Sequence, residues 1–150
     1  MFLYSALINE RIDRGRAAIT KLNSILRDRD VTLKTKTHIY HAKIKSTNTY
    51  AAETWRLKAK TAAKLNSTEM DFWRRSARTS RKDKIRNTII KQQMNVARSL
   101  LDDIKTKQLQ WHGHSQRMEK RRLPKEVMKW SPPGRRKRGR PNLIWAGGIR

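Results

Sequence analysis

Apolar residues recur at helical spacing along most of the first 118 residues, and no stretch shows the strong alternation of a half-buried strand. The clearest stripe runs through residues 5–29, where isoleucine or leucine returns every three or four positions and charged side chains fill the other faces. Further helices are expected from about Leu33 to Ser46, from Ala51 to about Arg75, and over residues 84–93 and 97–118. Thr32 is a suitable N-cap for the second helix, and Ser67 could cap a new helix that splits the third.

The composition changes after Arg121. Prolines and glycines interrupt every periodic pattern there, and residues 120–140 hold ten Lys or Arg against a single acid, Glu126. The predicted fold class is therefore mainly α. A short helical bundle over about residues 8–118, within a first region 1–120, precedes a basic, Pro/Gly-containing tail at 121–150 that is expected to be loop-like or disordered. The pattern stops without a clear end, which favours truncation.

Charge narrows the classes of function. The 150 residues include 37 Lys or Arg and 12 Asp or Glu, which gives a formal net charge of +25 and a pI of about 11.5. Such a chain is expected to bind polyanions, with nucleic acid the first candidate and anionic membrane the second. No apolar run approaches the roughly 20 residues of a membrane span. The absence of cysteine excludes disulfide scaffolds, zinc fingers and cysteine nucleophiles.

Two basic segments are the candidate nucleic-acid contacts. In the first, Phe72 and Trp73 are expected in the core, with arginines at its wet rim. The second ends in Arg-Gly-Arg-Pro at 138–141, which resembles an AT-hook for the minor groove of A·T-rich DNA, although a solvated basic loop that grips phosphates is preferred. The predicted contacts are Arg74, Arg75, Arg78, Arg81, Lys82, Arg135, Arg136, Lys137, Arg138 and Arg140.

No residue pattern points to catalysis. Asp102 and Asp103 are neighbours on a predicted helix, so they point about 100° apart and are expected on a solvated face rather than on one metal. His38 and His41 have helical i,i+3 spacing, but few acids and no cysteine accompany them. The sequence has neither a nucleophile-elbow serine nor a phosphate-cradling glycine loop. No catalytic residue, metal or cofactor is expected.

An ordered series of short landmarks runs along nearly the whole chain. It consists of Arg11-Ile12 with Ala17-Ala18 and Lys21-Leu22; Lys34 to Tyr40; Tyr50-Ala-Ala-Glu-Thr-Trp55; Glu69-Met70 with Trp73-Arg74-Arg75; Arg86-Asn87; Leu109-Gln-Trp-His-Gly-His114 with Arg117-Met118; Arg122-Leu123-Pro124; Trp130; Pro133-Gly134; Arg138-Gly-Arg-Pro141; and Trp145. In this order they resemble the segment that follows the polymerase core in jockey-type non-LTR (LINE-type) retrotransposon reverse transcriptases.

The resemblance implies a thumb and post-thumb region. The family's palm aspartates and its apurinic-type endonuclease lie upstream of this segment, so the chain is expected to be no enzyme on its own. The implied partners are RNA or DNA, bound through the backbone, and the missing polymerase core; no membrane is expected, the oligomeric state is open, and the implied localisation is nuclear. One alternative is a stand-alone AT-hook-like chromatin protein. Another is a chain that completes a polymerase in trans through an interface of Trp55, Phe72, Trp73 and Trp111.

The chain departs from the family at two positions. Lys45 and Asn48 stand where the family usually has apolar residues, so burial there is expected to be weaker or to need new partners. The family pattern favours core positions for Trp55 and Trp111. It also implies that Gly113 ends a helix or allows two elements to approach, and that His114 is structural.

Overall fold

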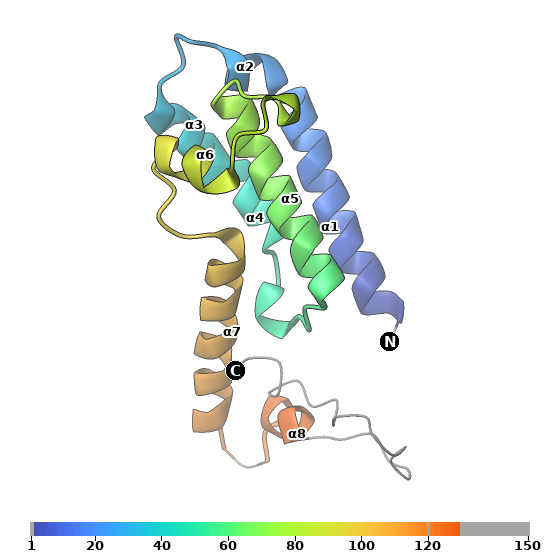
Figure 1. The fold of residues 1–150 in the computed structure, drawn as a ribbon. Helices are drawn as coiled ribbons and strands as arrows, with labels where there is room; N and C mark the ends of the chain where they lie inside the picture. Colours follow the sequence, from blue (N-terminus) through green and yellow to red (C-terminus); the bar gives the residue numbers. More distant parts are fainter. Residues whose placement is uncertain (1, 120, 130–150) are drawn as a thin grey trace. The chain divides into compact units, whose positions relative to one another are not determined.

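The computed structural model describes residues 2–119 and 121–129. All regular structure in these residues is helical, which confirms the mainly α class (Figure 1). The elements are α1 (Phe2–Lys21), α2 (Asn23–Arg27), α3 (Leu33–Ile39), η1 (Tyr40–Lys45), α4 (Ser46–Asn48), η2 (Ala52–Thr54), α5 (Ala59–Ser76), η3 (Arg81–Asp83), α6 (Asn87–Gln93), α7 (Leu100–Arg117) and α8 (Leu123–Lys129).

The chain divides into two compact units. Unit 1 comprises residues 1–50 and 58–103, and unit 2 comprises residues 51–57 and 104–150, of which the described part ends at residue 129. The predicted boundary near residue 120 rests on the change in composition and stays a prediction. The short segment 51–57 therefore belongs with the second half of α7 and not with its neighbours in sequence.

The first predicted helix is confirmed, with a turn at Leu22 that divides it into α1 and α2. The stripe of isoleucines and leucines is its buried face and comprises Ile8, Ile12, Ile19 and Leu26. Thr32 caps α3 as expected, because its hydroxyl accepts a hydrogen bond from the Thr35 N–H at 3.3 Å. The next helix then continues through the wide π-helical turns of η1 to Asn48.

The predicted split at Ser67 is wrong, because α5 is continuous across it. The Thr68 hydroxyl donates to the Lys64 carbonyl at 2.9 Å, one turn earlier in the same helix. Thr68 therefore lies inside α5 and does not begin a new helix. Burial of Leu65, Met70, Phe72 and Trp73 along the same helix outweighs the weak helix propensity of Asn66 and Ser67.

An aromatic cluster forms the centre of unit 1. Phe72 and Trp73 from α5 meet Tyr40 from η1, with ring centroids 4.7 to 5.2 Å apart. All three side chains are buried, so the expectation of core positions for Phe72 and Trp73 is confirmed. Ile19, Leu26, Ile44, Met70 and Ile90 complete the cluster.

Gly15 allows α4 to lie against α1. A Cβ atom added to Gly15 would stand 2.2 Å from the Asn48 side-chain oxygen, which is too close for any real contact. Asn48 is completely buried, and neither its side-chain oxygen nor its nitrogen has a hydrogen-bond partner. The departure at position 48 is thus accommodated by close packing on a glycine, at the cost of two unsatisfied polar atoms.

In unit 2, Gln108 joins α7 to the turn at 51–57. Its side-chain amide donates to the carbonyls of Ala52 at 3.3 Å and Trp55 at 2.7 Å. Leu109 is exposed, because Gln108 occupies the buried position one turn after Ile104. Trp55 is buried as expected, whereas Trp111 is half-buried.

Two expectations for the end of the described chain are wrong. Gly113 lies inside α7, and an added Cβ would meet only the Arg117 guanidinium at 3.5 Å, so it neither ends the helix nor permits a close approach. Residues 123–129 are helical rather than loop-like. Pro124 is the second residue of α8, where its missing N–H would have had no partner in any case.

Candidate nucleic-acid interface

The loop between α5 and α6, residues 77–86, is built by local hydrogen bonds. Helix α5 ends with Arg78 in the left-handed region at φ 58°, and the Thr79 N–H reaches back to the Arg74 carbonyl at 2.9 Å. Ser80 and Asp83 then form a capping box around η3, and the Ser80 N–H donates to the Asp83 carboxylate at 2.6 Å. Lys84 follows at φ 52°.

This basic loop presents five exposed cationic side chains: Arg78, Arg81, Lys82, Lys84 and Arg86. Asp83 is its only acid, and its carboxylate is already engaged by the backbone of Ser80. None of the five cations forms an ion pair with another described residue, although Arg81 reaches the Ser67 hydroxyl at 3.4 Å. Their charge is therefore available to an external anion.

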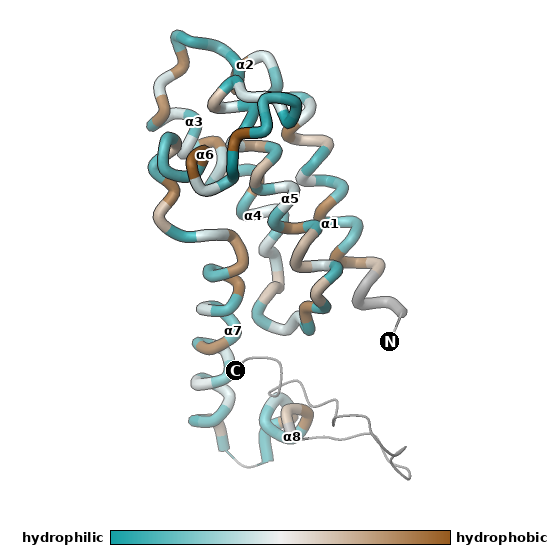
Figure 2. Tube along the Cα trace, in the orientation of Figure 1, coloured by the Kyte–Doolittle hydropathy of each residue, from teal (hydrophilic) through white to brown (hydrophobic). Residues whose placement is uncertain are grey.

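Lys36 joins the C-terminal end of α5, where the basic loop begins, to the end of α2. Its buried ammonium donates to the Asp28 carbonyl at 2.8 Å and to the Ser76 carbonyl at 3.4 Å, at the C-terminal ends of α2 and α5. Burial, followed by the nearby charge of Arg78, lowers the pKa of Lys36. Figure 2 shows mostly hydrophilic residues along the loops at this end of unit 1.

Arg74 and Arg75 have partners inside unit 1. The Arg74 guanidinium donates to the Ile85 carbonyl at 2.6 Å and to the Asn87 side-chain oxygen at 2.8 Å. Arg75 binds the Asp71 carboxylate at 3.1 Å and the Asn23 side-chain oxygen at 2.8 Å. Nucleic-acid binding by this pair stays a prediction, since each would have to exchange these acceptors for phosphates.

The other predicted contacts, Arg135, Arg136, Lys137, Arg138 and Arg140, lie outside the described residues. Within the described chain, the structure thus brings Arg78, Arg81 and Lys82 onto one loop and adds Lys84 and Arg86 to them. Lys84 and Arg86 could have been predicted from the sequence, because they continue the basic run that contains Arg78, Arg81 and Lys82.

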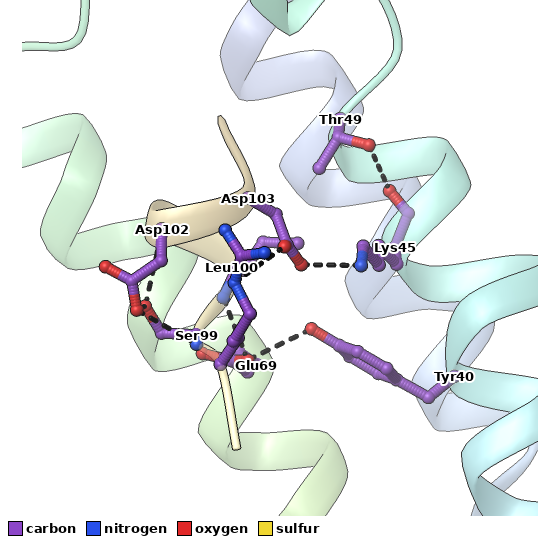
Figure 3. A network of polar contacts seen from close by, with 9 residues as sticks. Tyr40, Lys45, Thr49, Glu69, Ser99, Leu100, Asp102 and Asp103 are labelled. Atoms are coloured by element: carbon purple, nitrogen blue, oxygen red, sulfur yellow. Dashed lines mark hydrogen bonds and ion pairs between the residues drawn. The ribbon is translucent and has the colours of Figure 1, made fainter. Parts of the chain in front are cut away.

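A buried polar network is centred on Glu69 of α5 (Figure 3). The Glu69 carboxylate is completely buried and accepts from the Tyr40 hydroxyl and from the Leu100 N–H, both at 3.1 Å, while Lys91 lies 3.5 Å from its other oxygen. Burial and the adjacent Glu69 carboxylate raise the pKa of Tyr40 above its usual range. Glu69 thereby joins η1, α6 and the start of α7 to α5.

The expected solvated face at Asp102 and Asp103 is wrong for Asp103. Asp103 forms an ion pair with Lys45 and lies 3.7 Å from Arg98, and its side chain is only 19% exposed (Figure 3). Asp102 instead caps α7 through Ser99, whose N–H donates to it at 3.1 Å. Lys45 has therefore acquired the new partner that its position requires, and the two aspartates do not converge on a common point.

The histidines form no metal-binding group. No cluster of three or more His, Asp or Glu side chains suited to a metal occurs among residues 2–119 and 121–129. His41 has its pKa lowered by partial burial and by the charge of Lys45, which outweigh the opposing effect of Asp103. The His114 ring lies 5.7 Å from the Trp111 ring on an exposed face of α7.

No helix in the described part of the chain is long and apolar enough to cross a membrane. Comparison of the chain with protein-family models, with curated proteins and with solved structures finds no match.

Proposed function

We propose that this chain binds the phosphate backbone of RNA or DNA, and that the basic loop of residues 77–86 is a principal contact. The observation that carries the proposal is the group of five exposed cations without an acidic partner among the described residues. Phosphates supply the missing counter-charge, and each contact releases a condensed counterion. The net charge of +25 adds a long-range electrostatic attraction between the protein and the polyanion.

The ordered landmarks support a more specific origin for this activity. They favour a catalytically incomplete C-terminal segment of a non-LTR retrotransposon reverse transcriptase, in which helices lie beside the primer–template duplex. The separate roles of Asp102 and Asp103 are consistent with this proposal, because two-metal phosphoryl transfer needs converging carboxylates. The purified protein should therefore add no nucleotides to any primer with Mg²⁺ or Mn²⁺. Incorporation that survives removal of contaminating polymerases would overturn this part of the proposal.

The binding site is tested by the salt dependence of affinity for a duplex. If six to ten phosphates are neutralised in total, affinity should fall by about 10³ to 10⁵ between 50 and 200 mM salt. The variant Lys82→Gln/Lys84→Gln/Arg86→Gln should lower affinity and reduce the log–log slope by about one for each cation removed.

A matched control removes the same charge elsewhere. The variant Arg14→Gln/Arg16→Gln/Lys21→Gln changes three exposed cations of α1, of which Arg14 and Arg16 already pair with Glu10 and Asp13. It should reduce the slope less than the loop variant does. Equal slopes for the two variants would show non-specific attraction to the whole surface and would exclude the loop as a principal site.

Duplex composition tests the remaining alternative. Backbone binding predicts similar affinity for A/T-rich and G/C-rich duplexes, because their phosphates are the same. An A/T preference that disappears with Arg138→Ala would favour an AT-hook-like protein instead.

A further inference from the structure

Tyr50 holds an aromatic ring in solvent at the end of α4. Its side chain is 63% exposed, although the two preceding residues, Asn48 and Thr49, are buried. Among the Tyr, Trp and Phe side chains whose burial the structure describes, the others are buried or half-buried. A ring of this size usually lowers its free energy by packing into a core, so its exposure points to an external partner.

Arg11 covers one face of this ring. Its guanidinium carbon lies 4.4 Å from the centroid of Tyr50, within the range of a cation–π interaction. The other arginines of α1 have acidic partners, since Arg14 pairs with Glu10 and Arg16 with Asp13. Arg11 has no carboxylate partner among the described residues, and its charge lies beside an exposed aromatic surface.

We propose that Tyr50 and Arg11 form a stacking site for an unpaired base of single-stranded RNA or DNA. Arg11 lies over the ring, yet Tyr50 stays 63% exposed, so aromatic surface remains on which a base can stack. Arg11 orients the ring and carries positive charge toward the adjoining phosphate. The bases of an intact duplex are stacked on their neighbours, so this site selects single strands. The inference rests on the proposed function and adds the class of substrate to it.

The test compares three probes of equal length with the full-length protein: a labelled oligo(dT) strand, the same sugar-phosphate strand without bases, and a duplex. Tyr50→Ala should weaken binding of oligo(dT) about 5- to 100-fold, which corresponds to the usual contribution of one stacked base. Binding of the abasic strand and of the duplex should change by less than about twofold, because phosphate contacts remain. Tyr50→Trp should keep or increase the affinity for oligo(dT).

Arginine variants separate stacking from general charge. Arg11→Gln should weaken binding of oligo(dT) more than Arg14→Gln, which removes the same charge from a residue already paired with Glu10. Thermal unfolding followed by circular dichroism confirms that each variant is folded. Equal losses for Arg11→Gln and Arg14→Gln would exclude a specific role for Arg11.

The outcomes distinguish this inference from the proposed function. If Tyr50→Ala binds all three probes as the wild type does, or loses the same factor on all three, the stacking site is excluded while backbone binding stands. If the wild type binds none of the probes, the proposed function fails and the stacking site fails with it.

Discussion

The two units bury polar side chains in different surroundings. Unit 1 contains both the aromatic cluster of Tyr40, Phe72 and Trp73 and the buried Glu69 carboxylate. The groups that donate hydrogen bonds to this carboxylate belong to residues 22 to 31 positions away from Glu69 in the sequence. In unit 2, the buried apolar residues of the described part are Ala52, Trp55 and Ile104, and Gln108 supplies the side-chain hydrogen bonds to the carbonyls at 52 and 55.

The difference shows two ways to stabilise a chain with few large apolar residues. Leu, Ile, Val and Phe total 29 of 150 residues, about 19%, which is close to the range in which disorder competes with folding. Unit 1 gathers several segments around one charge, so that a single side chain orders the ends of several helices. In unit 2, the side-chain amide of Gln108 supplies hydrogen-bond donors to the backbone carbonyls of the turn at residues 51–57. Substitution of Glu69 in unit 1 and of Gln108 in unit 2 should therefore lower the free energy of unfolding by different amounts.

Glu69→Ala should have the largest effect. It leaves the buried Tyr40 hydroxyl and Leu100 N–H without their acceptor and Lys91 without its counter-charge, so the free energy of unfolding should fall by about 3–5 kcal/mol. Urea unfolding measures the loss. Glu69→Gln keeps one carbonyl acceptor and should lose less, and a loss below about 1 kcal/mol for Glu69→Ala would contradict the central role of this carboxylate.

Gly15→Ala tests the close approach in unit 1. Alanine favours a helix over glycine by about 1 kcal/mol, yet the clash with Asn48 should make the substitution destabilising by about 1–3 kcal/mol. The double variant Gly15→Ala/Asn48→Ala should recover much of the loss, as thermal unfolding would show. Lys21→Ala, at an exposed position of α1, serves as the control; a stabilised Gly15→Ala variant would mean that the packing is looser than the structure shows.

Gln108→Ala should have a smaller effect. It removes the donors to the Ala52 and Trp55 carbonyls, and we expect a loss of about 1–2 kcal/mol. Hydrogen exchange should show faster opening at residues 51–57, with little change around Glu69. Gln110→Ala on an exposed face of the same helix should be nearly neutral, and an equal effect of the two variants would exclude the specific contact.

The smallest effect should appear as a pH dependence. The pKa of His41 is lowered in the folded protein, so the unfolded chain binds more protons between that value and the ordinary value near 6.5. Stability should consequently fall as the pH falls through this window. His41→Gln should flatten the decrease in thermal unfolding temperature, and an unchanged slope would exclude His41 as its source.

Local patterns predicted the elements of this fold better than its connections. The isoleucine stripe of α1, the cap at Thr32 and the buried Phe72 and Trp73 could all be read from spacing or neighbouring residue types. Glu69 could not, because one acid on an amphipathic helix looks like a surface residue until its donors, which are distant in sequence, are in place. The contact of Gly15 with Asn48 likewise depends on two helices that the sequence does not pair.

The candidate interface shows the same limit. Charge density predicted a basic run that includes Arg78, Arg81 and Lys82, and the structure places all three on one exposed loop. The engagement of Arg74 with Ile85 and Asn87 depends on the fold of that loop, so charge alone could not separate it from its neighbours.

Two cationic residues of the basic loop have left-handed backbone conformations, which lower the stability of the fold while they keep positive charge on its surface. Arg78 and Lys84 have φ values of 58° and 52°, a region that costs a side-chain-bearing residue about 1 kcal/mol and glycine almost nothing. Glycine at either position would stabilise the fold and remove a cation from the surface. Selection for thermal stability alone would therefore favour glycine in place of Arg78 and Lys84. Variants isolated in that way should lose affinity for phosphate as they gain resistance to heat.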